Sequence, residues 1–125
     1  MQKASRAILI VDDDSRNIFA LSAVLKSKGF HTLAAPGMKE AFELLKQNSN
    51  VGIILLDMMM PDMDGYEALP VLKRDEKWAA IPVVAVTAQA MTGDRERCLS
   101  AGADGYLSKP VDVEQLLQLL KEHLK

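Results

Sequence analysis

The sequence has little of what marks several special classes of protein. Its single cysteine, Cys98, cannot form an internal disulfide or a thiolate metal cluster, which agrees with a reducing compartment. Its longest unbroken apolar run covers only residues 7–11, whereas a membrane-spanning helix needs roughly 20 apolar residues. Asp12, Asp13 and Asp14 then interrupt the apolar stretch that a secretory signal would require. We therefore expect a cytoplasmic protein with no transmembrane segment.

Positive charge and aromatic side chains are also scarce. The chain has 15 Lys and Arg against 17 Asp and Glu, for a net charge of −2, and only 5% of its residues are aromatic. Without a basic stripe or aromatics for base stacking, direct binding of nucleic acid is not expected. The 125 residues, 49% hydrophobic and 26% charged, fit one compact domain over residues 1–125 with no output domain.

Five short apolar segments alternate with segments of helical periodicity. The strand-like segments are residues 7–11, 30–34, 52–56, 82–86 and 105–108. The first, third and fourth are apolar at nearly every position, which is typical of parallel strands covered on both faces. The alternation predicts an α/β fold, a (βα)5 three-layer sandwich with right-handed crossovers. The pattern alone does not fix the strand order, for which the flavodoxin-like, doubly wound order 2-1-3-4-5 is one common solution.

Three of the intervening helices have informative ends. Asp64 is suited to be the N-cap of the third helix, but Pro70 lies beyond its first turn, so we expect a kink or a late start there. The fourth helix is predicted over residues 92–100. The last helix begins after Asp112, which together with Gln115 resembles a capping box.

Polar side chains collect at the ends of four of the five predicted strands. Asp12 and Asp13 follow the first, Asp57 the third, Thr87 the fourth and Lys109 the fifth. Because open α/β sheets bind ligands at the carboxyl ends of their strands, we expect these groups to converge. Three neighbouring carboxylates repel one another and imply a cation, and oxygen ligands without His or Cys favour Mg²⁺ over Ca²⁺. With the hydroxyl and the ammonium, they predict a phosphoryl site.

Each of these residues also has an ordinary structural interpretation. A single aspartate at a strand end is usually a turn or cap residue, a description that fits Asp14. Thr87 could cap the following helix, and Lys109 could be a solvated surface lysine. Complementary groups at four strand ends are poorly explained by independent accidents, so we favour the site.

Four motifs resemble the receiver domain of two-component response regulators along essentially the whole chain. The motifs are ILIVDDD (8–14), LLDMMMPDMDG (55–65), VVAVTA (83–88) and SKP (108–110). The resemblance implies the flavodoxin-like fold and a phosphoacceptor function. Asp57 would take a phosphoryl group from a phosphohistidine on a histidine kinase or a histidine phosphotransfer protein.

The resemblance also implies a metal site. Asp13 and Asp57 would be direct Mg²⁺ ligands, Asp12 would act through water, and the main-chain carbonyl of Met59 would complete the protein ligands.

A conformational switch is the third implication of the resemblance. Thr87 would sense the phosphoryl group, Lys109 would be the fixed ammonium, and the Lys109–Pro110 bond would be cis. Thr87 would move inward and Tyr106 would fill the space it leaves. An ordinary aromatic, half packed against the last two helices, fits Tyr106 equally well. The fourth helix, fifth strand and fifth helix would form the face that meets a downstream protein target.

The sequence departs from the family pattern near the acceptor. Met58 and Met59 are apolar where many relatives have polar groups, and Gln89 lies two residues after Thr87. We hypothesise that Met59 slows the water that hydrolyses the acyl phosphate. The alternative is that the methionines fill an irregular gap in the core.

Two other function classes compete with the phosphoacceptor. Residues 11–15 loosely resemble the start of haloacid-dehalogenase phosphatases, with Asp12 as nucleophile and Asp14 as acid, but the chain is short for that fold and Asp57 would have no role. A pseudo-receiver that signals by binding alone would not need the five site residues.

Residues 87–95 and 108–112 resemble the receivers of hybrid kinases and phosphorelays, so the chain is either a free-standing receiver or one excised from a larger protein. A monomer or weak dimer is expected.

Overall fold

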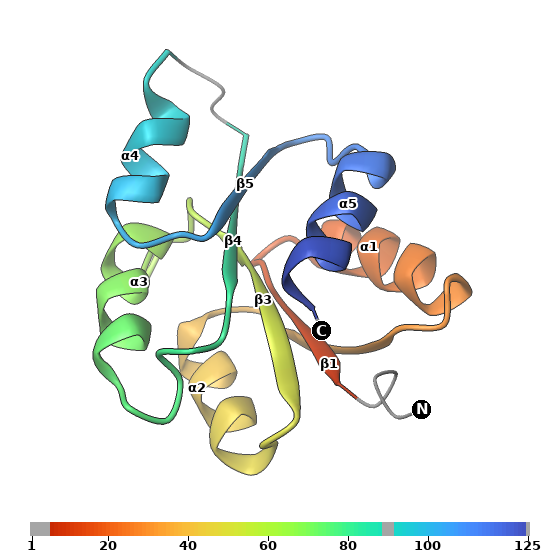
Figure 1. Ribbon diagram of the computed structural model, residues 1–125, viewed down its shortest axis with the longest axis horizontal. Coiled ribbons are helices and arrows are strands. Elements are labelled where there is room, and N and C mark those ends of the chain that lie inside the picture. Colours follow the sequence, from red (N-terminus) through yellow and green to blue (C-terminus); the bar gives the residue numbers. More distant parts are fainter. Residues whose placement is uncertain (1–5, 89–91, 125) are drawn as a thin grey trace.

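A single parallel sheet lies between two layers of helices in the computed structural model, which describes residues 6–88 and 92–124 (Figure 1). The strands in these ranges are β1 (Ala7–Val11), β2 (His31–Ala35), β3 (Val51–Asp57), β4 (Val83–Thr87) and β5 (Gly105–Ser108). They lie in the order β2-β1-β3-β4-β5, and every neighbouring pair is parallel. The predicted fold class and strand order are confirmed.

The helices of the described ranges divide between the two faces of the sheet (Figure 1). They are α1 (Ser15–Ser27), α2 (Met38–Gln47), α3 (Gly65–Arg74), α4 (Asp94–Ser100) and α5 (Val113–His123). Buried residues of α1 and α5 share one hydrophobic cluster, and those of α2, α3 and α4 share another on the opposite face. The sheet therefore has a separate apolar layer on each side.

The central strands explain why both faces must be covered. Every residue of β1, β3 and β4 is buried. In β1, Leu9 and Val11 point into the cluster under α2, α3 and α4, while Ile8 and Ile10 point into the cluster under α1 and α5. Because side chains alternate along a strand, a continuous apolar run supplies both layers at once.

Three strands begin and end one residue away from the predicted limits, and two of these shifts concern the site. Asp57 and Thr87 are the last residues of β3 and β4 and do not lie beyond them. In β2, Phe30 is excluded because its N–H bonds to the carbonyl of Leu25, in a C-terminal cap of α1 that places Gly29 at φ 90°.

The third helix begins where its cap predicts. The Asp64 carboxylate accepts from the N–H of Glu67, and the Glu67 carboxylate accepts from the N–H of Asp64. This capping box satisfies two N–H groups of the first turn. The helix runs from Gly65 through Pro70 to Arg74, so the expectation of a late start is wrong.

The starts of α4 and α5 are also set by their caps. Gly93 precedes α4 at φ 87°, a left-handed conformation outside a right-handed helix, so α4 begins at Asp94, two residues after the predicted start. Asp112 accepts from the N–H groups of Glu114 and Gln115, which confirms it as the N-cap of α5. None of the described helices has the length and hydrophobicity that crossing a bilayer requires.

Candidate functional site

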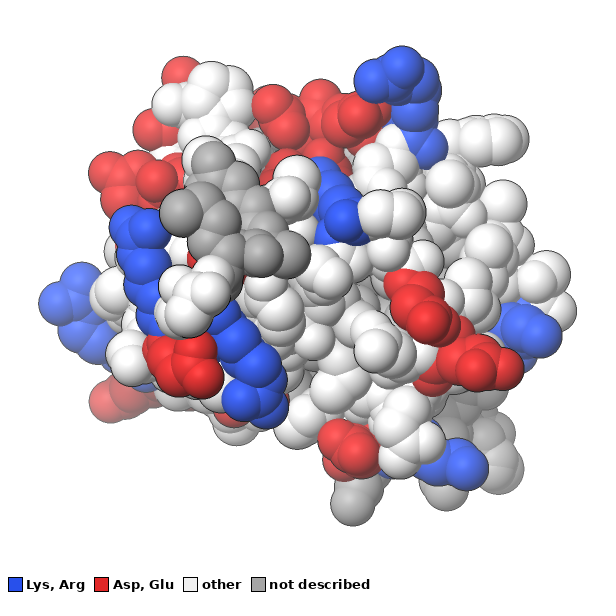
Figure 2. Space-filling model, turned by 90° about the horizontal axis from the view of Figure 1, so that it is seen from above, with Lys and Arg blue, Asp and Glu red and all other residues white. Residues whose placement is uncertain are grey.

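Three aspartates meet at the carboxyl end of the sheet. β1 and β3 are neighbours, with Val11 opposite Leu56, so the residues that follow, Asp12 and Asp57, come together. One carboxylate oxygen from each of Asp12, Asp13 and Asp57 lies within 4.8 Å of the others. The view onto this end of the molecule shows acidic side chains gathered beside basic ones (Figure 2). The topology therefore concentrates negative charge at one point.

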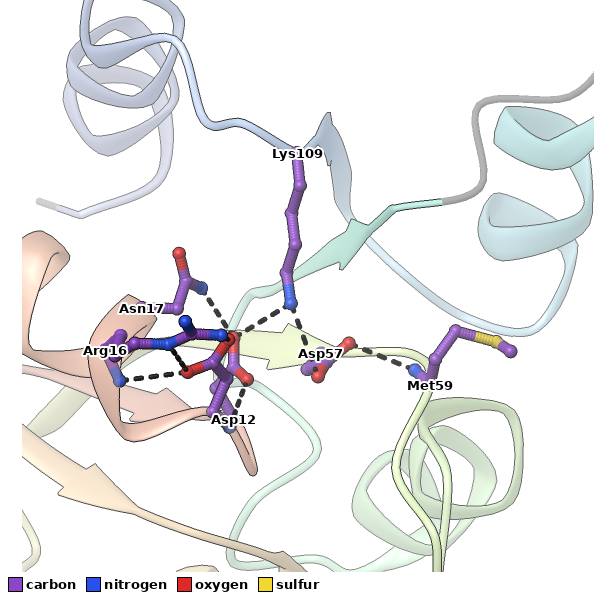
Figure 3. Close-up of polar contacts among 7 residues, drawn as sticks. Asp12, Arg16, Asn17, Asp57, Met59 and Lys109 are labelled. Atoms are coloured by element: carbon purple, nitrogen blue, oxygen red, sulfur yellow. Dashed lines mark hydrogen bonds and ion pairs between the residues drawn. The ribbon is translucent and has the colours of Figure 1, made fainter.

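Lys109 reaches over the two buried carboxylates from the loop after β5 (Figure 3). Its Nζ lies 3.1 Å from Asp12 Oδ2 and 3.5 Å from Asp57 Oδ2, and its side chain is 22% exposed. The Lys109–Pro110 peptide bond is cis. These ion pairs exclude the interpretation of Lys109 as a freely solvated lysine.

Asp12 is held in place by groups that follow it in the chain. Its carboxylate accepts from the N–H of Asp14 at 2.9 Å and from the side-chain amide of Asn17, in the first turn of α1. Asn17 was not predictable from the sequence as a site residue, because its contact depends on how α1 packs over the end of β1. The Asp12 residue is only 2% exposed. Together with the Lys109 contact, these bonds give its buried carboxylate the partners that it needs and hold it in place.

The electrostatics of the site centre on Asp57. Burial raises its pKa to about 6, and the charge of Asp12 acts in the same direction. The Met59 N–H donates to Asp57 Oδ1 at 3.1 Å and, with Lys109, opposes that rise. For Lys109, burial lowers the pKa, but the hydrogen bond to Asp12 and the charge of Asp57 outweigh it and raise the pKa above its ordinary value. The described arrangement thus has an excess of negative charge.

The donor set fits a magnesium ion. Three carboxylates and one ammonium leave a net charge of −2 when all are ionised, which a divalent cation would neutralise. All three side-chain groups present hard oxygen atoms, the ligands that Mg²⁺ prefers. Asp13 is exposed while Asp12 and Asp57 are buried, so the cluster opens to water on one side, as an ion that keeps several water ligands requires.

Thr87 lies on the strand next to Asp57. It follows Val86, which pairs with Asp57, and it is 1% exposed. Its carbonyl accepts from the N–H of Lys109 at 2.8 Å, which fixes the end of β4 to the start of the loop that follows β5. Since α4 is preceded by Gly93, Thr87 is not the cap of that helix.

Tyr106, the proposed switch aromatic, is half-buried on β5. Its hydroxyl donates to Asp94 Oδ2 at 2.8 Å. Asp94 has no sequence signal that marks it, yet it is only 9% exposed and is a buried charged residue apart from the aspartate cluster. Gln89 lies outside the described residues.

The methionines after Asp57 have different environments. Met58 is 0% exposed and Met60 is 7% exposed, and both belong to the hydrophobic cluster, which agrees with the interpretation that they fill the core. The Met59 side chain is 48% exposed and extends away from the Asp57 carboxylate (Figure 3).

Asp14 has the structural role suggested for a single strand-end aspartate. Its side chain accepts from the N–H of Arg16 as the N-cap of α1 and pairs with the Arg16 guanidinium at 3.3 Å. These contacts, with the exposed Arg16, hold its pKa below the usual range. A carboxylate held in this way is a poor general acid, which weakens the haloacid-dehalogenase interpretation.

Comparisons with known proteins agree with this geometry. A profile of the response regulator receiver domain matches residues 8–121. The chain is 33% identical over 120 residues to the polar-differentiation response regulator DivK of Brucella ovis, covering 96% of this chain and 97% of DivK.

Two solved structures are also similar. One is the receiver domain of the sensor histidine kinase PA1611 from Pseudomonas aeruginosa, with a magnesium ion coordinated in its active-site cleft (32% identity, TM-score 0.85, 95% and 97% coverage). The other is the receiver domain of the Saccharomyces cerevisiae response regulator Ssk1, crystallised with the histidine phosphotransfer protein Ypd1 (26% identity, TM-score 0.85, covering 95% of this chain and 88% of the Ssk1 chain). None of these matches supports a haloacid-dehalogenase phosphatase. The chain belongs to the response regulator receiver domain family, the signalling domains of two-component and phosphorelay systems.

Proposed function

We propose that Asp57 is the phosphoryl acceptor of this receiver and that the chain catalyses its own phosphorylation and dephosphorylation. The observation that carries the proposal is the position of its carboxylate, which is 3% exposed and shares the Lys109 ammonium with the buried carboxylate of Asp12. The arrangement gives one nucleophilic oxygen, a charge-balancing ammonium and a second acidic ligand at a single point.

In the proposed transfer, an Asp57 carboxylate oxygen forms a bond to the phosphorus of a phosphohistidine. The phosphorus–nitrogen bond breaks, and its electron pair stays on the imidazole nitrogen, which takes a proton from solvent. In the proposed dephosphorylation, water attacks the phosphorus of the acyl phosphate. The bond between the phosphorus and the Asp57 oxygen breaks, Asp57 leaves as a carboxylate, and inorganic phosphate is released. Both steps depend mainly on positioning and charge neutralisation.

The surrounding residues would hold the metal and the phosphoryl group. Asp13 and Asp57 would be the direct Mg²⁺ ligands, Asp12 would act through water, and the Met59 carbonyl would be the main-chain ligand. When bound, Mg²⁺ supplies a Lewis acid that offsets the charge on the phosphoryl oxygens. Lys109 already lies 3.5 Å from Asp57 and is placed to pair with a phosphoryl oxygen there.

Thr87 and Tyr106 are the proposed switch residues. Thr87 is buried beside the acceptor strand, and its hydroxyl would bond to a phosphoryl oxygen on Asp57. Tyr106 lies on the adjacent β5, in register with Ala85, two residues before Thr87. A movement of Thr87 toward the phosphoryl group would change the space available to Tyr106 and so alter the face of α4, β5 and α5.

The proposed partners are a histidine kinase or a histidine phosphotransfer protein upstream and a protein target downstream. Support comes from the similarity to the Ssk1 receiver, which was crystallised with a phosphotransfer protein, and to the receiver of a sensor histidine kinase. We propose one receiver domain over residues 1–125, acting as a monomer or weak dimer.

The test is phosphorylation by acetyl phosphate with Mg²⁺, followed by intact mass measurement and mapping of the modified residue. The expected result is one phosphoryl group on Asp57, lost when Mg²⁺ is chelated and absent in Asp57→Asn. The matched control is Asp62→Asn, an exposed aspartate of the β3–α3 loop, which should be labelled like the native chain. Label on another residue, or label that persists in Asp57→Asn, would refute the proposal. Absence of any label would favour a pseudo-receiver that signals by binding.

A further inference from the structure

A further buried carboxylate, that of Asp94, lies outside the aspartate site and joins three elements of the fold. Asp94, the first residue of α4, is 9% exposed. Its Oδ2 accepts from the hydroxyl of Tyr106 on β5 at 2.8 Å, and its Oδ1 accepts from the hydroxyl of Tyr66 on α3 at 3.2 Å. One side chain therefore connects α3, α4 and β5.

Further contacts tie Tyr66 to the same helix. The guanidinium of Arg97 lies 4.0 Å from the centre of the Tyr66 ring, and Cys98 Sγ lies 3.5 Å from its hydroxyl. Burial raises the pKa of both tyrosines, so both hydroxyls stay neutral and able to donate near neutral pH. A hydrogen bond from a hydroxyl to a carboxylate is among the stronger kinds, and a buried acceptor that loses its donor is costly. The two tyrosine hydroxyls and the Asp94 carboxylate therefore act as one unit.

This unit is coupled to the aspartate site through β5. Tyr106 lies three residues before Lys109, which contacts Asp12 and Asp57 directly. The Lys109 N–H bonds to the carbonyl of Thr87, so the strand that carries Tyr106 is fixed to the strand that carries Thr87. A shift at the carboxyl ends of β4 and β5 consequently acts on the Tyr106 hydroxyl and, through it, on Asp94.

We propose that Asp94 is a positioning residue whose shared carboxylate makes Tyr66 and Tyr106 respond together, so that occupation of the Asp57 site is transmitted to α3 as well as to the face of α4 and β5. The inference rests on the proposed function of Asp57. Its physical basis is that one carboxylate cannot follow a moving Tyr106 hydroxyl without changing its bond to Tyr66. The tyrosine on α3 thereby becomes a second reporter of the switch.

The experiment uses the fact that these are the two tyrosines of the chain. Protein labelled with ¹³C at the tyrosine ζ carbon gives two NMR signals, which Tyr66→Phe and Tyr106→Phe assign. Beryllofluoride with Mg²⁺ serves as the phosphoryl analogue, and the ¹⁹F signal of its bound form reports occupation of the site independently of either tyrosine. In the native chain both ¹³C signals are expected to shift with the same midpoint as beryllofluoride binds.

The decisive variant is Tyr106→Phe, which removes one oxygen atom and keeps the ring. The remaining Tyr66 signal is expected to lose its shift while the ¹⁹F signal of bound beryllofluoride persists. Asp94→Ala provides a second test, in which Tyr106 still responds and Tyr66 does not. The matched control is Asp104→Ala, which removes another link to α3, the 2.7 Å ion pair with Lys73, together with the hydrogen bond from the Val83 N–H, but leaves the bonds of Asp94 to the two tyrosines in place.

The outcomes distinguish failure of the coupling through Asp94 from failure of the proposed function of Asp57. If beryllofluoride binds to the native chain and Tyr66 does not shift, or if Tyr66 still shifts fully in Tyr106→Phe, the coupling through Asp94 is refuted and the function of Asp57 stands. If Asp104→Ala abolishes the Tyr66 shift as well, the response reflects general loosening of α3 and the role of Asp94 is also refuted. If the native chain gives no ¹⁹F signal of bound beryllofluoride, both proposals fail.

Discussion

Replacing Gly65 by alanine should destabilise the domain because the chain passes unusually close at this point. Gly65 begins α3, and its N–H bonds to the carbonyl of Met58 at 3.2 Å. A Cβ atom added at Gly65 would lie 2.9 Å from the Met58 Cα and closer still to its Sδ. Met58 is fully buried, so neither its side chain nor its backbone can move away freely.

The magnitude follows from two opposing effects. Overfilling a packed core costs roughly 1–3 kcal/mol. Alanine at a position whose backbone it can adopt gains about 0.4–1 kcal/mol, because the unfolded chain loses freedom. We therefore expect Gly65→Ala to lower the free energy of unfolding by about 1–2 kcal/mol.

Urea unfolding monitored by Trp78 fluorescence measures this loss. Trp78 stacks on Phe42 with ring centroids 5.5 Å apart, so its emission follows the loss of tertiary packing. In a Met58→Ala background much of the clash is absent, and Gly65→Ala should cost less there than in the native chain. An unchanged urea midpoint for Gly65→Ala, or an equal cost in both backgrounds, would contradict the steric argument.

Three further predictions test other parts of the structure. Because burial raises the pKa of Tyr106 to about 12, and that of Tyr66 also rises, near-ultraviolet absorbance should show almost no phenolate in the folded protein at about pH 10. Since the unfolded chain ionises first, stability should fall as the pH rises above about 10, and half-ionised phenols in folded protein at that pH would contradict this. Asp64→Ala removes the capping box and should cost about 1 kcal/mol in urea unfolding, whereas an equal stability would show that the cap is dispensable. If the Met59 side chain shields the acyl phosphate, Met59→Asn should release phosphate from the phosphorylated chain faster than the native sequence does, whereas equal rates would agree with a side chain that extends away from Asp57.

The fold was predictable because its strongest determinants are local in the sequence. The apolar run of residues 7–11 is buried on both faces, as its composition predicts, and Asp112 caps the helix that it precedes. The limits of the strands were less certain, because a hydrogen bond such as that from Phe30 to Leu25 depends on the cap geometry of the preceding helix. Apolar periodicity does not contain that information.

The aspartate cluster was predictable because one topological rule places the ends of parallel strands together. The contact of Asp94 with Tyr66 and Tyr106 was not, since it joins positions 28 and 12 residues apart through two helices and an edge strand. In the sequence, Asp94 is one charged residue in a polar segment of alternating charges. Pro70 shows the opposite case: its position predicted a kink or a late start, and the helix nevertheless begins at Gly65, under the capping box of Asp64 and Glu67.

The buried thiol of Cys98 makes the domain convenient for site-directed labelling. Cys98 is 0% exposed, and burial raises the pKa of its thiol. The thiolate is the form that attacks alkylating reagents, so this buried cysteine should react slowly in the folded protein. As the chain has no other cysteine, a thiol introduced at an exposed position such as Ala23 would take up a spin label or fluorophore selectively without any prior replacement of Cys98.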